Sequence, residues 1–358
     1  MTRNLLPRPA LSRALVLGAV LALAVPGTAY ANTVTATVKT PGATSGPASA
    51  NSEISTHADC SSGLISGGGI NQAIGTGTSV NGNHVNGTSP SSNGTTEYTG
   101  STGVVGTDVT HWLGIGGSGG QVNASFSTTP YAVCFTSNLI NHTQVVMNKA
   151  NTPTAGATTG LVTATCPANT RLLGGGARTT PGNTGSLKAI ATFPTFNDSA
   201  HAFGAKAAAD GETNPDSWTA VGWDSGANSA NYTYAYAICS GSGINASGAT
   251  VKVRHTEVSG PTTGSTGQTA TVGCGQGDGN LVAGGAAISG GSVTTTNFTG
   301  PGSGGDHLNG SFPSTSGGTA VSDGTTTAAY WTASSHAGGQ SSPGTYTDAW
   351  ALCANDGV

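Results

Sequence analysis

The chain has 358 residues, of which 58 are glycine and only 7% are charged. Eleven Lys and Arg against 15 Asp and Glu give a formal net charge of −4, and the dispersed basic residues argue against nucleic acid as a partner. Disorder usually goes with few β-branched residues and a high net charge. Here short alternating runs of Val, Ile and Thr recur, and Gly interrupts every stretch with helical spacing. We therefore expect an all-β protein.

The first 31 residues have the features of a secretion signal. Three arginines at positions 3, 8 and 13 precede a short apolar core at 15–25, and Ala29-Tyr30-Ala31 is a small-x-small cleavage site. Cleavage after Ala31 would leave eight Lys and Arg against 15 acidic residues. The apolar run is too short to anchor a folded protein in a membrane, and no second one follows it. We expect a secreted, extracellular protein without a membrane span.

One pattern then occurs three times: a cysteine, a Leu/Ile-x-Gly/Ala-Gly-Gly segment, a Ser/Thr-x-Pro turn, a tryptophan, and an aromatic-Ala-x-Cys ending. The Trp and closing Cys are 22, 21 and 22 residues apart in the pairs Trp112 and Cys134, Trp218 and Cys239, and Trp331 and Cys353. We divide the chain into a signal peptide, 1–31, and three β-modules, 32–138, 139–243 and 244–358. Each module has the size of one β-sandwich domain.

Each module is expected to open with a strand, at 34–38, 143–147 and 249–253. In the second module, further strands are predicted at 161–166, from Leu172 into the glycines, up to the turn at Pro194, and at 218–223 and 232–239. Glycine inside a strand usually marks a bulge, a bend or the close approach of another backbone. The large Trp218 is expected in the core, packed near the cysteines.

The six cysteines fall two per module, at the entry and the exit of each repeat. In a secreted chain this indicates structural disulfides, and the repeat selects the pairs Cys60–Cys134, Cys166–Cys239 and Cys274–Cys353. Closing a loop of this length stabilises a module by about 4 kcal/mol in the chain-entropy model. Two arrangements remain open: three tandem β-sandwich-like modules, each with its own core, or a single pseudo-threefold, β-prism-like assembly.

The closing strand separates small from aromatic residues, because alternate side chains point to opposite faces. Ala235, Ala237 and Cys239 share one face of the second module. Aromatic residues occupy the other face of the closing strands and are either core or glycan contacts: Tyr131, Tyr232, Tyr234, Tyr236, Tyr346 and Trp350.

The repeat resembles modules of secreted proteins from high-GC Gram-positive bacteria, which often stand at the C-terminal end of collagen-like surface proteins. Cys166-Pro167 to Ala177, and Ala235 to Cys239, match that pattern best. The resemblance implies an extracellular β-rich module and no enzymatic activity. The collagen-like Gly-x-y segment is missing from this chain.

No arrangement of acid, base or nucleophile recurs among the repeats, so we expect no catalytic residues and no cofactor. The Gly-x-Ser-x-Gly match at 116–120 lacks the strand-to-helix context that a nucleophile needs. An acidic loop, Asp210 to Asp216, could hold calcium through its carboxylates, but it has no counterpart in the other modules. Turn formation explains it better, and we expect no metal site.

Two functions follow as hypotheses. The first is a non-catalytic extracellular structural or adhesion protein of a bacterial surface or its surroundings, since repetition multiplies weak contacts. The alternative is a carbohydrate-binding, lectin-like protein with repeated weak sites. The partners would be cell-surface or extracellular glycans or other surface proteins. The oligomeric state is left open.

Overall fold

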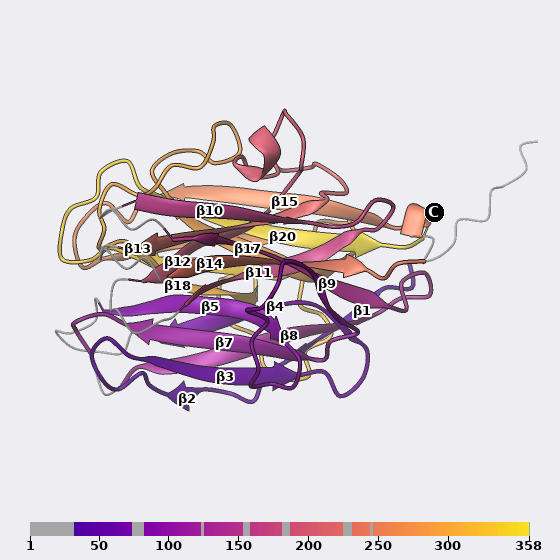
Figure 1. Ribbon diagram of the computed structural model, residues 1–358, viewed down its shortest axis with the longest axis horizontal. Helices are drawn as coiled ribbons and strands as arrows, with labels where there is room; N and C mark the ends of the chain where they lie inside the picture. Colours follow the sequence, from indigo (N-terminus) through magenta and orange to yellow (C-terminus); the bar gives the residue numbers. More distant parts are fainter. Residues whose placement is uncertain are drawn as a thin grey trace, which may run out of the picture.

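The computed structural model describes residues 32–73, 82–122, 125–152, 158–180, 187–224, 231–243 and 246–357. The expected signal peptide lies outside these residues. The all-β prediction is confirmed: the described chain forms three antiparallel sheets whose strands run lengthwise through the molecule (Figure 1). Two short 3-10 helices, Ala202–Gly204 and Ala246–Gly248, lie in connections. Among the described residues, no helix has the length and apolar character needed to cross a membrane.

Sheet A contains, in spatial order, β1 (Thr35–Lys39), β8 (Ser127–Thr136), β4 (Leu64–Ala73), β18 (His307–Ser314), β19 (Tyr330–His336) and β16 (Gly267–Gly273), with β2 (Thr44–Ser45) paired to β8. Sheet B contains β3 (Glu53–Asp59), β7 (His111–Ser118), β5 (Asn83–Ser91), β11 (Leu172–Thr180), β14 (Tyr232–Ser240), β9 (Thr143–Asn151) and β6 (Gly103–Thr107). Sheet C contains β10 (Thr158–Thr165), β13 (Ser217–Asp224), β12 (Lys188–Thr195), β17 (Asn280–Ser289), β20 (Tyr346–Asn355) and β15 (Thr250–Ser259).

Every repeat is divided between two sheets. Its opening, glycine-bearing and closing strands form one half, and its cysteine-leading, proline-bearing and tryptophan-bearing strands form the other. Sheet A joins one half of the first repeat to one half of the third. Sheet B joins halves of the second and first repeats, and sheet C joins halves of the third and second repeats. Of the two predicted arrangements, this cyclic sheet order matches the pseudo-threefold assembly, in which the repeats share their sheets.

The same register joins the halves in all three sheets. The proline-bearing strand pairs with the glycine-bearing strand of another repeat at Ser311 and Ile70, Thr88 and Ala177, and Thr192 and Ala286. The residue two before each proline also accepts a hydrogen bond from the indole N–H of its own repeat's tryptophan. These bonds run from Trp331 to Ser311, from Trp112 to Thr88, and from Trp218 to Thr192, at 2.7–2.9 Å. All three tryptophans are fully buried, as expected for core residues.

The glycine run is required because each of its positions meets a different neighbour. In the second repeat, a Cβ on Gly175 would lie 2.3 Å from Cγ of Trp218, and one on Gly176 would lie 2.1 Å from the carbonyl oxygen of Thr88. Both distances are far below van der Waals contact, so these positions exclude a side chain. The register also shifts at a bulge between Leu172 and Gly174. The sequence-based prediction of a bulge or a close backbone approach is therefore confirmed here.

The first position of each run lies at the pseudo-threefold axis. A Cβ on Gly67 would lie 2.6 Å from the Cβ of Ala283, and a Cβ on Gly174 would lie 2.4 Å from the same atom. One methyl group, that of Ala283, thus occupies the space where the three repeats meet.

The three expected disulfides are present: Cys60–Cys134, Cys166–Cys239 and Cys274–Cys353. Each one joins the two halves of a single repeat, which lie in different sheets. The disulfides therefore connect all three sheets covalently.

Moving the axial methyl group provides a test of this packing. Gly67→Ala should lower the free energy of unfolding by about 1–3 kcal/mol, because two methyl groups then compete for one space. Combining it with Ala283→Gly should restore much of the loss, since the remaining neighbours of the new Cβ lie at 3.4 Å or more. Denaturant unfolding of both single variants and the double variant measures this coupling.

Gly174→Ala is the matched control. Its new Cβ would also lie 2.4 Å from the backbone oxygen of Ser66, so Ala283→Gly should rescue it less well. Additive effects of Gly67→Ala and Ala283→Gly would contradict the axial contact.

The second repeat expressed alone, residues 139–243, should not fold as a monomer. Its strands β11 and β12 would each lose the neighbour that another repeat supplies. We expect no cooperative thermal transition at low concentration in an oxidising buffer, whereas residues 32–358 should show one. A monomer in sedimentation analysis that melts cooperatively would contradict the shared-sheet architecture.

Candidate functional site

The closing-strand aromatics, which the sequence offered as possible glycan contacts, are mostly interior. Tyr236 and Trp350 are 0% exposed, Tyr131 and Tyr234 are 4% exposed, and only Tyr232 and Tyr346 remain partly exposed. The glycan-contact hypothesis is therefore corrected for the four buried rings, because a ligand cannot stack on a ring that other side chains cover.

For Tyr236, Trp350 and Tyr131, the cover comes from another repeat. The Tyr236 hydroxyl donates to the carbonyl oxygen of Tyr98 at 2.8 Å, and the Trp350 indole N–H donates to that of Ala208 at 3.0 Å. Tyr98 and Ala208 belong to the segments that connect the proline-bearing and tryptophan-bearing strands of the preceding repeats. Tyr131 packs in the same way against Phe312, with ring centroids 6.2 Å apart, and beside Val321 of the third repeat. These segments interlock the repeats in a cycle, and sequence periodicity contains no signal for such a cover.

Tyr232 keeps one feature of a contact surface. The Nζ of Lys149 lies 5.3 Å from the centroid of its ring, and the ring of Tyr234 is 6.1 Å away. In the third repeat the position equivalent to Lys149 carries Glu257, which lies in register with Asp348. The structure therefore does not bring the two partly exposed tyrosines into a repeated site.

The outer faces of the three sheets differ at one set of equivalent positions, although their cores match. This position stands two residues after the last glycine of each glycine run. In sheet B this position carries Arg178, which pairs with Glu53 at 2.9 Å and with Glu97 at 2.6 Å. Burial alone would raise the pKa of Glu53, but the hydrogen bonds and charge of Arg178 prevail and lower it. Two carboxylates around one buried guanidinium make this a structural ion cluster between two repeats.

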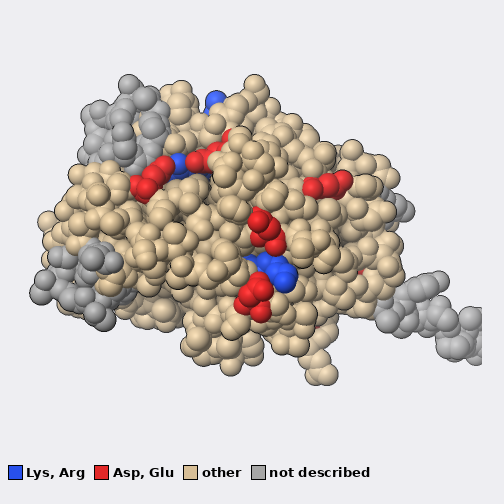
Figure 2. All heavy atoms as spheres, turned by 90° about the horizontal axis from the view of Figure 1, so that it is seen from below, with Lys and Arg blue, Asp and Glu red and all other residues tan. Residues whose placement is uncertain are grey.

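In sheet C the equivalent position is apolar. Ala287, Ala191 and Val221 lie in register there and belong to one buried cluster with Val293 and Phe298. In sheet A the same register holds Asn71, Gly310 and Ser334, which are uncharged and small. Charged residues are also sparse over the face of the molecule in Figure 2.

The acidic loop is used for local bonding. Asp210 contacts Arg254 at 3.4 Å, Glu212 accepts from the backbone N–H of Ala209 at 2.7 Å, and Asp216 accepts from that of Asn197 at 2.8 Å. Its carboxylates are thus engaged in turns and ion pairs. Within the ranges that the structure describes, no group of three or more His, Cys, Asp or Glu side chains is arranged to hold a metal ion.

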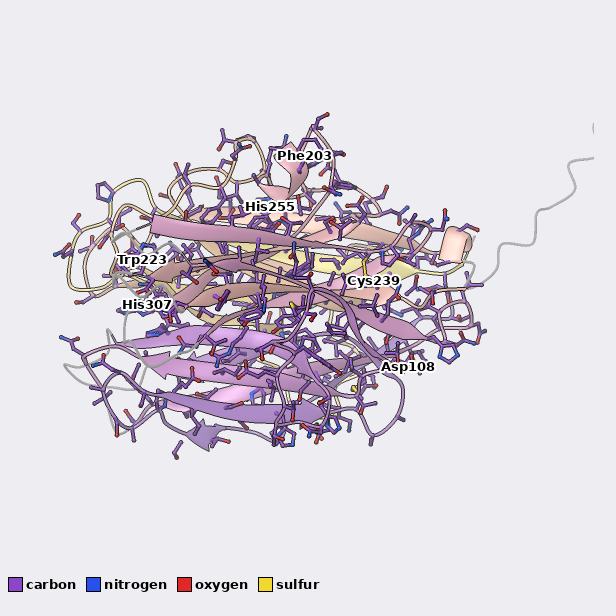
Figure 3. All side chains as sticks on the ribbon, in the orientation of Figure 1. Asp108, Phe203, Trp223, Cys239, His255 and His307 are labelled. Carbon is purple, nitrogen blue, oxygen red and sulfur yellow. A yellow bond between two sulfur atoms is a disulfide. The ribbon has the colours of Figure 1, made fainter. Side chains whose placement is uncertain are left out.

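A buried polar cluster occupies one end of the pseudo-threefold axis. His84, Lys188 and His307 each stand six residues before the proline of their repeat, so the pseudosymmetry brings them together. The His84 and His307 rings are 6.2 Å apart, and His336 lies 5.6 Å from His307. His307 and Trp223 are labelled at this end of the molecule, opposite Asp108 (Figure 3).

Hydrogen bonds hold part of this polar cluster. Lys188 donates to the carbonyl oxygen of Gly304 at 2.7 Å and lies 4.6 Å from the centroid of the Trp223 ring. His84 places its two ring nitrogens 2.9 and 3.2 Å from the carbonyl oxygens of Gly82 and Leu187. This cluster was not predicted from the sequence, because its histidines are far apart in the chain. The shared distance to the proline was the available signal.

Burial and the neighbouring charge of Lys188 lower the pKa of His84 to about 4 and hold that of His307 well below its usual range. Burial lowers the pKa of His336 as well, and it lowers the pKa of Lys188 to about 7 against the attraction of Asp306. The interior therefore disfavours every positive charge in the cluster.

No protein-family model matches the chain, and no similar sequence is found among curated proteins. The resemblance of its repeats to secreted bacterial modules remains a prediction, and the function has to be argued from the geometry.

Acid should destabilise the protein through this polar cluster. The unfolded chain binds protons on its histidines below a pKa of about 6.5, whereas folded His84 does so only near pH 4, so stability should fall as the pH drops through this window. Between pH 7.5 and 4, His84 alone should contribute up to about 3 kcal/mol to the decrease in unfolding free energy. Urea unfolding at both pH values should show a smaller decrease for His84→Gln.

His142→Gln is the matched control, because that side chain is 62% exposed and lies outside the polar cluster. It should leave the acid-induced decrease as it is in the unsubstituted protein. If His84→Gln and the unsubstituted protein lost equal stability, burial of His84 would not be the cause.

Proposed function

We propose that this protein is a non-catalytic extracellular structural or adhesion protein of a bacterial surface or its surroundings. The observation that carries the proposal is the contrast between a threefold-repeated core and three dissimilar outer faces. The Trp-to-hydroxyl bonds, the glycine contacts and the junction register recur in all repeats. The outer positions carry an ion cluster, an apolar cover and a small polar surface, in sheets B, C and A respectively.

This division fits a rigid body that presents surfaces. Three disulfides connect the three sheets, and structural disulfides are typical of oxidising, extracellular surroundings. The buried polar groups are committed to holding repeats together: Arg178 joins the second repeat to the first, and Lys188 joins the second to the third. A surface with few charges suits contacts made through hydrogen bonds and shape.

The alternative, a carbohydrate-binding protein with three repeated aromatic sites, loses support from the residues first chosen for it. Tyr131, Tyr236 and Trp350 serve as interlocking core. Any glycan contact would have to use an outer face that the repeats do not share.

Retention on bacterial surfaces tests the proposed function. Fluorescently labelled residues 32–358 should sediment with whole cells and with isolated cell walls of a high-GC Gram-positive bacterium, well above the level of the same chain after reduction and unfolding. The folded protein should also release no product from chromogenic glycosides, esters and peptides. Equal retention of folded and unfolded chains would refute adhesion, and measurable turnover would refute the non-catalytic assignment.

A further inference from the structure

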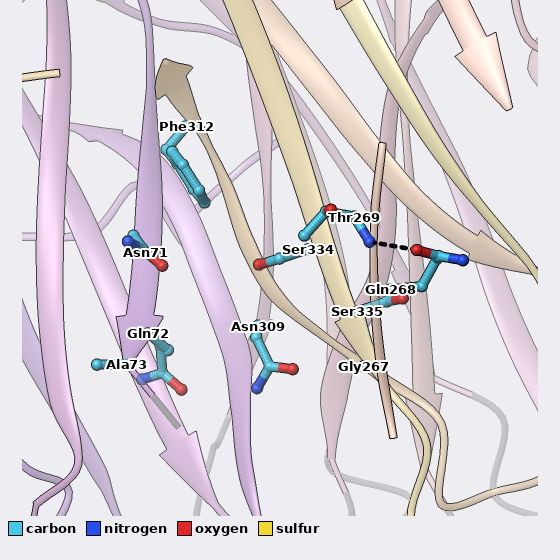
Figure 4. A pocket seen from close by; sticks show the side chains of 10 residues that line it. All are labelled: Asn71, Gln72, Ala73, Gly267, Gln268, Thr269, Asn309, Phe312, Ser334 and Ser335. Carbon is cyan, nitrogen blue, oxygen red and sulfur yellow. Dashed lines mark hydrogen bonds between the residues drawn. The ribbon is translucent and has the colours of Figure 1, made fainter. Parts of the chain in front are cut away.

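Sheet A contains a groove on the outer face where sheets B and C are filled. It has a volume of about 340 Å³ and is lined by β4, β18, β19 and β16, with Asn71, Phe312, Ser334 and Thr269 among its lining residues. Small-ligand sites commonly occupy ~300–1,000 Å³. In Figure 4, the side chains of Asn71 and Ser334 approach the groove from opposite sides, with the Phe312 ring at one end.

Gly310 allows two groups that line the groove to lie close to the β18 backbone. It pairs with Asn71 on one side and Ser334 on the other, and a Cβ at this position would lie 2.7 Å from both the Phe312 ring and the Ser334 hydroxyl. A larger residue at position 310 would therefore displace the Phe312 ring or the Ser334 hydroxyl.

The pseudosymmetry shows what fills the same place elsewhere. In sheet B, the equivalent Gly87 is covered by the stem of Arg178, whose Cδ lies 2.7 Å from where a Cβ of Gly87 would be. In sheet C, the equivalent position is Ala191, buried with Phe298 and Val293. The groove is thus a difference between faces that share one backbone framework.

The lining of the groove determines which ligands suit it. None of its lining residues carries a charge, so an anionic or cationic ligand would gain no ion pair there. An entirely apolar ligand would cover the Ser334 hydroxyl without offering it a hydrogen bond once water is displaced, which is costly. A peptide adds a strand at the edge of a sheet, which here is β16 at one side of the groove. Such a strand would not lie over Asn71 and Gly310, which belong to strands with neighbours on both sides.

Side-chain amides and hydroxyls among apolar lining atoms match a ligand with many hydroxyls and apolar C–H faces. The Phe312 ring is 5% exposed, so it borders the groove without offering a face on which a ligand could stack. The side chain of Asn71 is already positioned by a hydrogen bond with Tyr131. Gln268 and Thr269 from β16 add an amide and a hydroxyl at the far side of the groove.

We propose that the groove of sheet A binds a neutral saccharide, as a mono- or disaccharide unit of a larger glycan. The inference deepens the proposed adhesive function and rests on it, since it supplies that function with a contact site. The site differs from the aromatic strand faces considered first, and only one of the three sheets provides it.

Saturation-transfer NMR on residues 32–358 can screen neutral saccharides as probes: glucose, galactose, mannose, N-acetylglucosamine, maltose and cellobiose. Calorimetric titration then gives the Kd of the strongest binder. Ser334→Val places in sheet A the side chain that sheet C carries at Val221, and Thr269→Val alters an exposed residue at the rim. Each substitution should weaken binding at least about tenfold, with an unchanged melting temperature for Thr269→Val.

Ser55→Val is the matched control, because Ser55 occupies the position of Thr269 in sheet B. It should bind the saccharide with an unchanged Kd. Binding to none of the six probes, or equal affinities of the groove variants and Ser55→Val, would overturn the inference. If the protein is still retained on cell walls in either case, the proposed adhesive function stands. If both saccharide binding and cell-wall retention are absent, the adhesive function is refuted as well.

Discussion

Gly67, Gly174 and Ala283 meet at the pseudo-threefold axis, where three chains leave room for one methyl group. This close approach depends on glycine, because any additional Cβ would overlap that of Ala283. The same strands must pass under a tryptophan and against the backbone of another repeat one and two residues later. A run of small residues in the centre of a strand, which would ordinarily weaken it, is here the condition for bringing three sheets together.

The close approach at the axis works because the repeats also hold one another at the periphery. Each glycine-bearing strand pairs with a strand of another repeat, and each closing aromatic is covered by a segment of another repeat. The disulfides supply the complementary link, since they join the halves that the sheets separate. No repeat can bury its own aromatic face alone, so stability belongs to the assembly. Cooperative unfolding of all three repeats follows from this distribution of contacts.

Pseudosymmetry also separates structural from surface residues. Positions that recur, such as Trp218 and Thr192 with their equivalents, form the core. Two sets of equivalent positions differ. At one end of the axis, His84, Lys188 and His307 occupy the same position in the three repeats. On the outer faces of the sheets, Asn71 and Arg178 occupy equivalent positions. At the axial end the difference makes stability sensitive to protons, because desolvation opposes every charge there. On the outer faces, the difference leaves sheet A with a groove and sheet B with an ion cluster.

The all-β class, the three repeats, the disulfide pairs and the burial of the tryptophans could be predicted from the residues alone, because alternation, spacing and cysteine count are local or periodic signals. The sequence also indicated that the glycine run marks a bulge or close approach. Which repeat pairs with which, and the cover over Tyr236 and Trp350, became visible in the folded chain. Period two assigns a side chain to a face of a strand but does not say what packs on that face. The groove beside Gly310 was hidden for the same reason, since an empty space is defined by neighbours from four strands and two repeats.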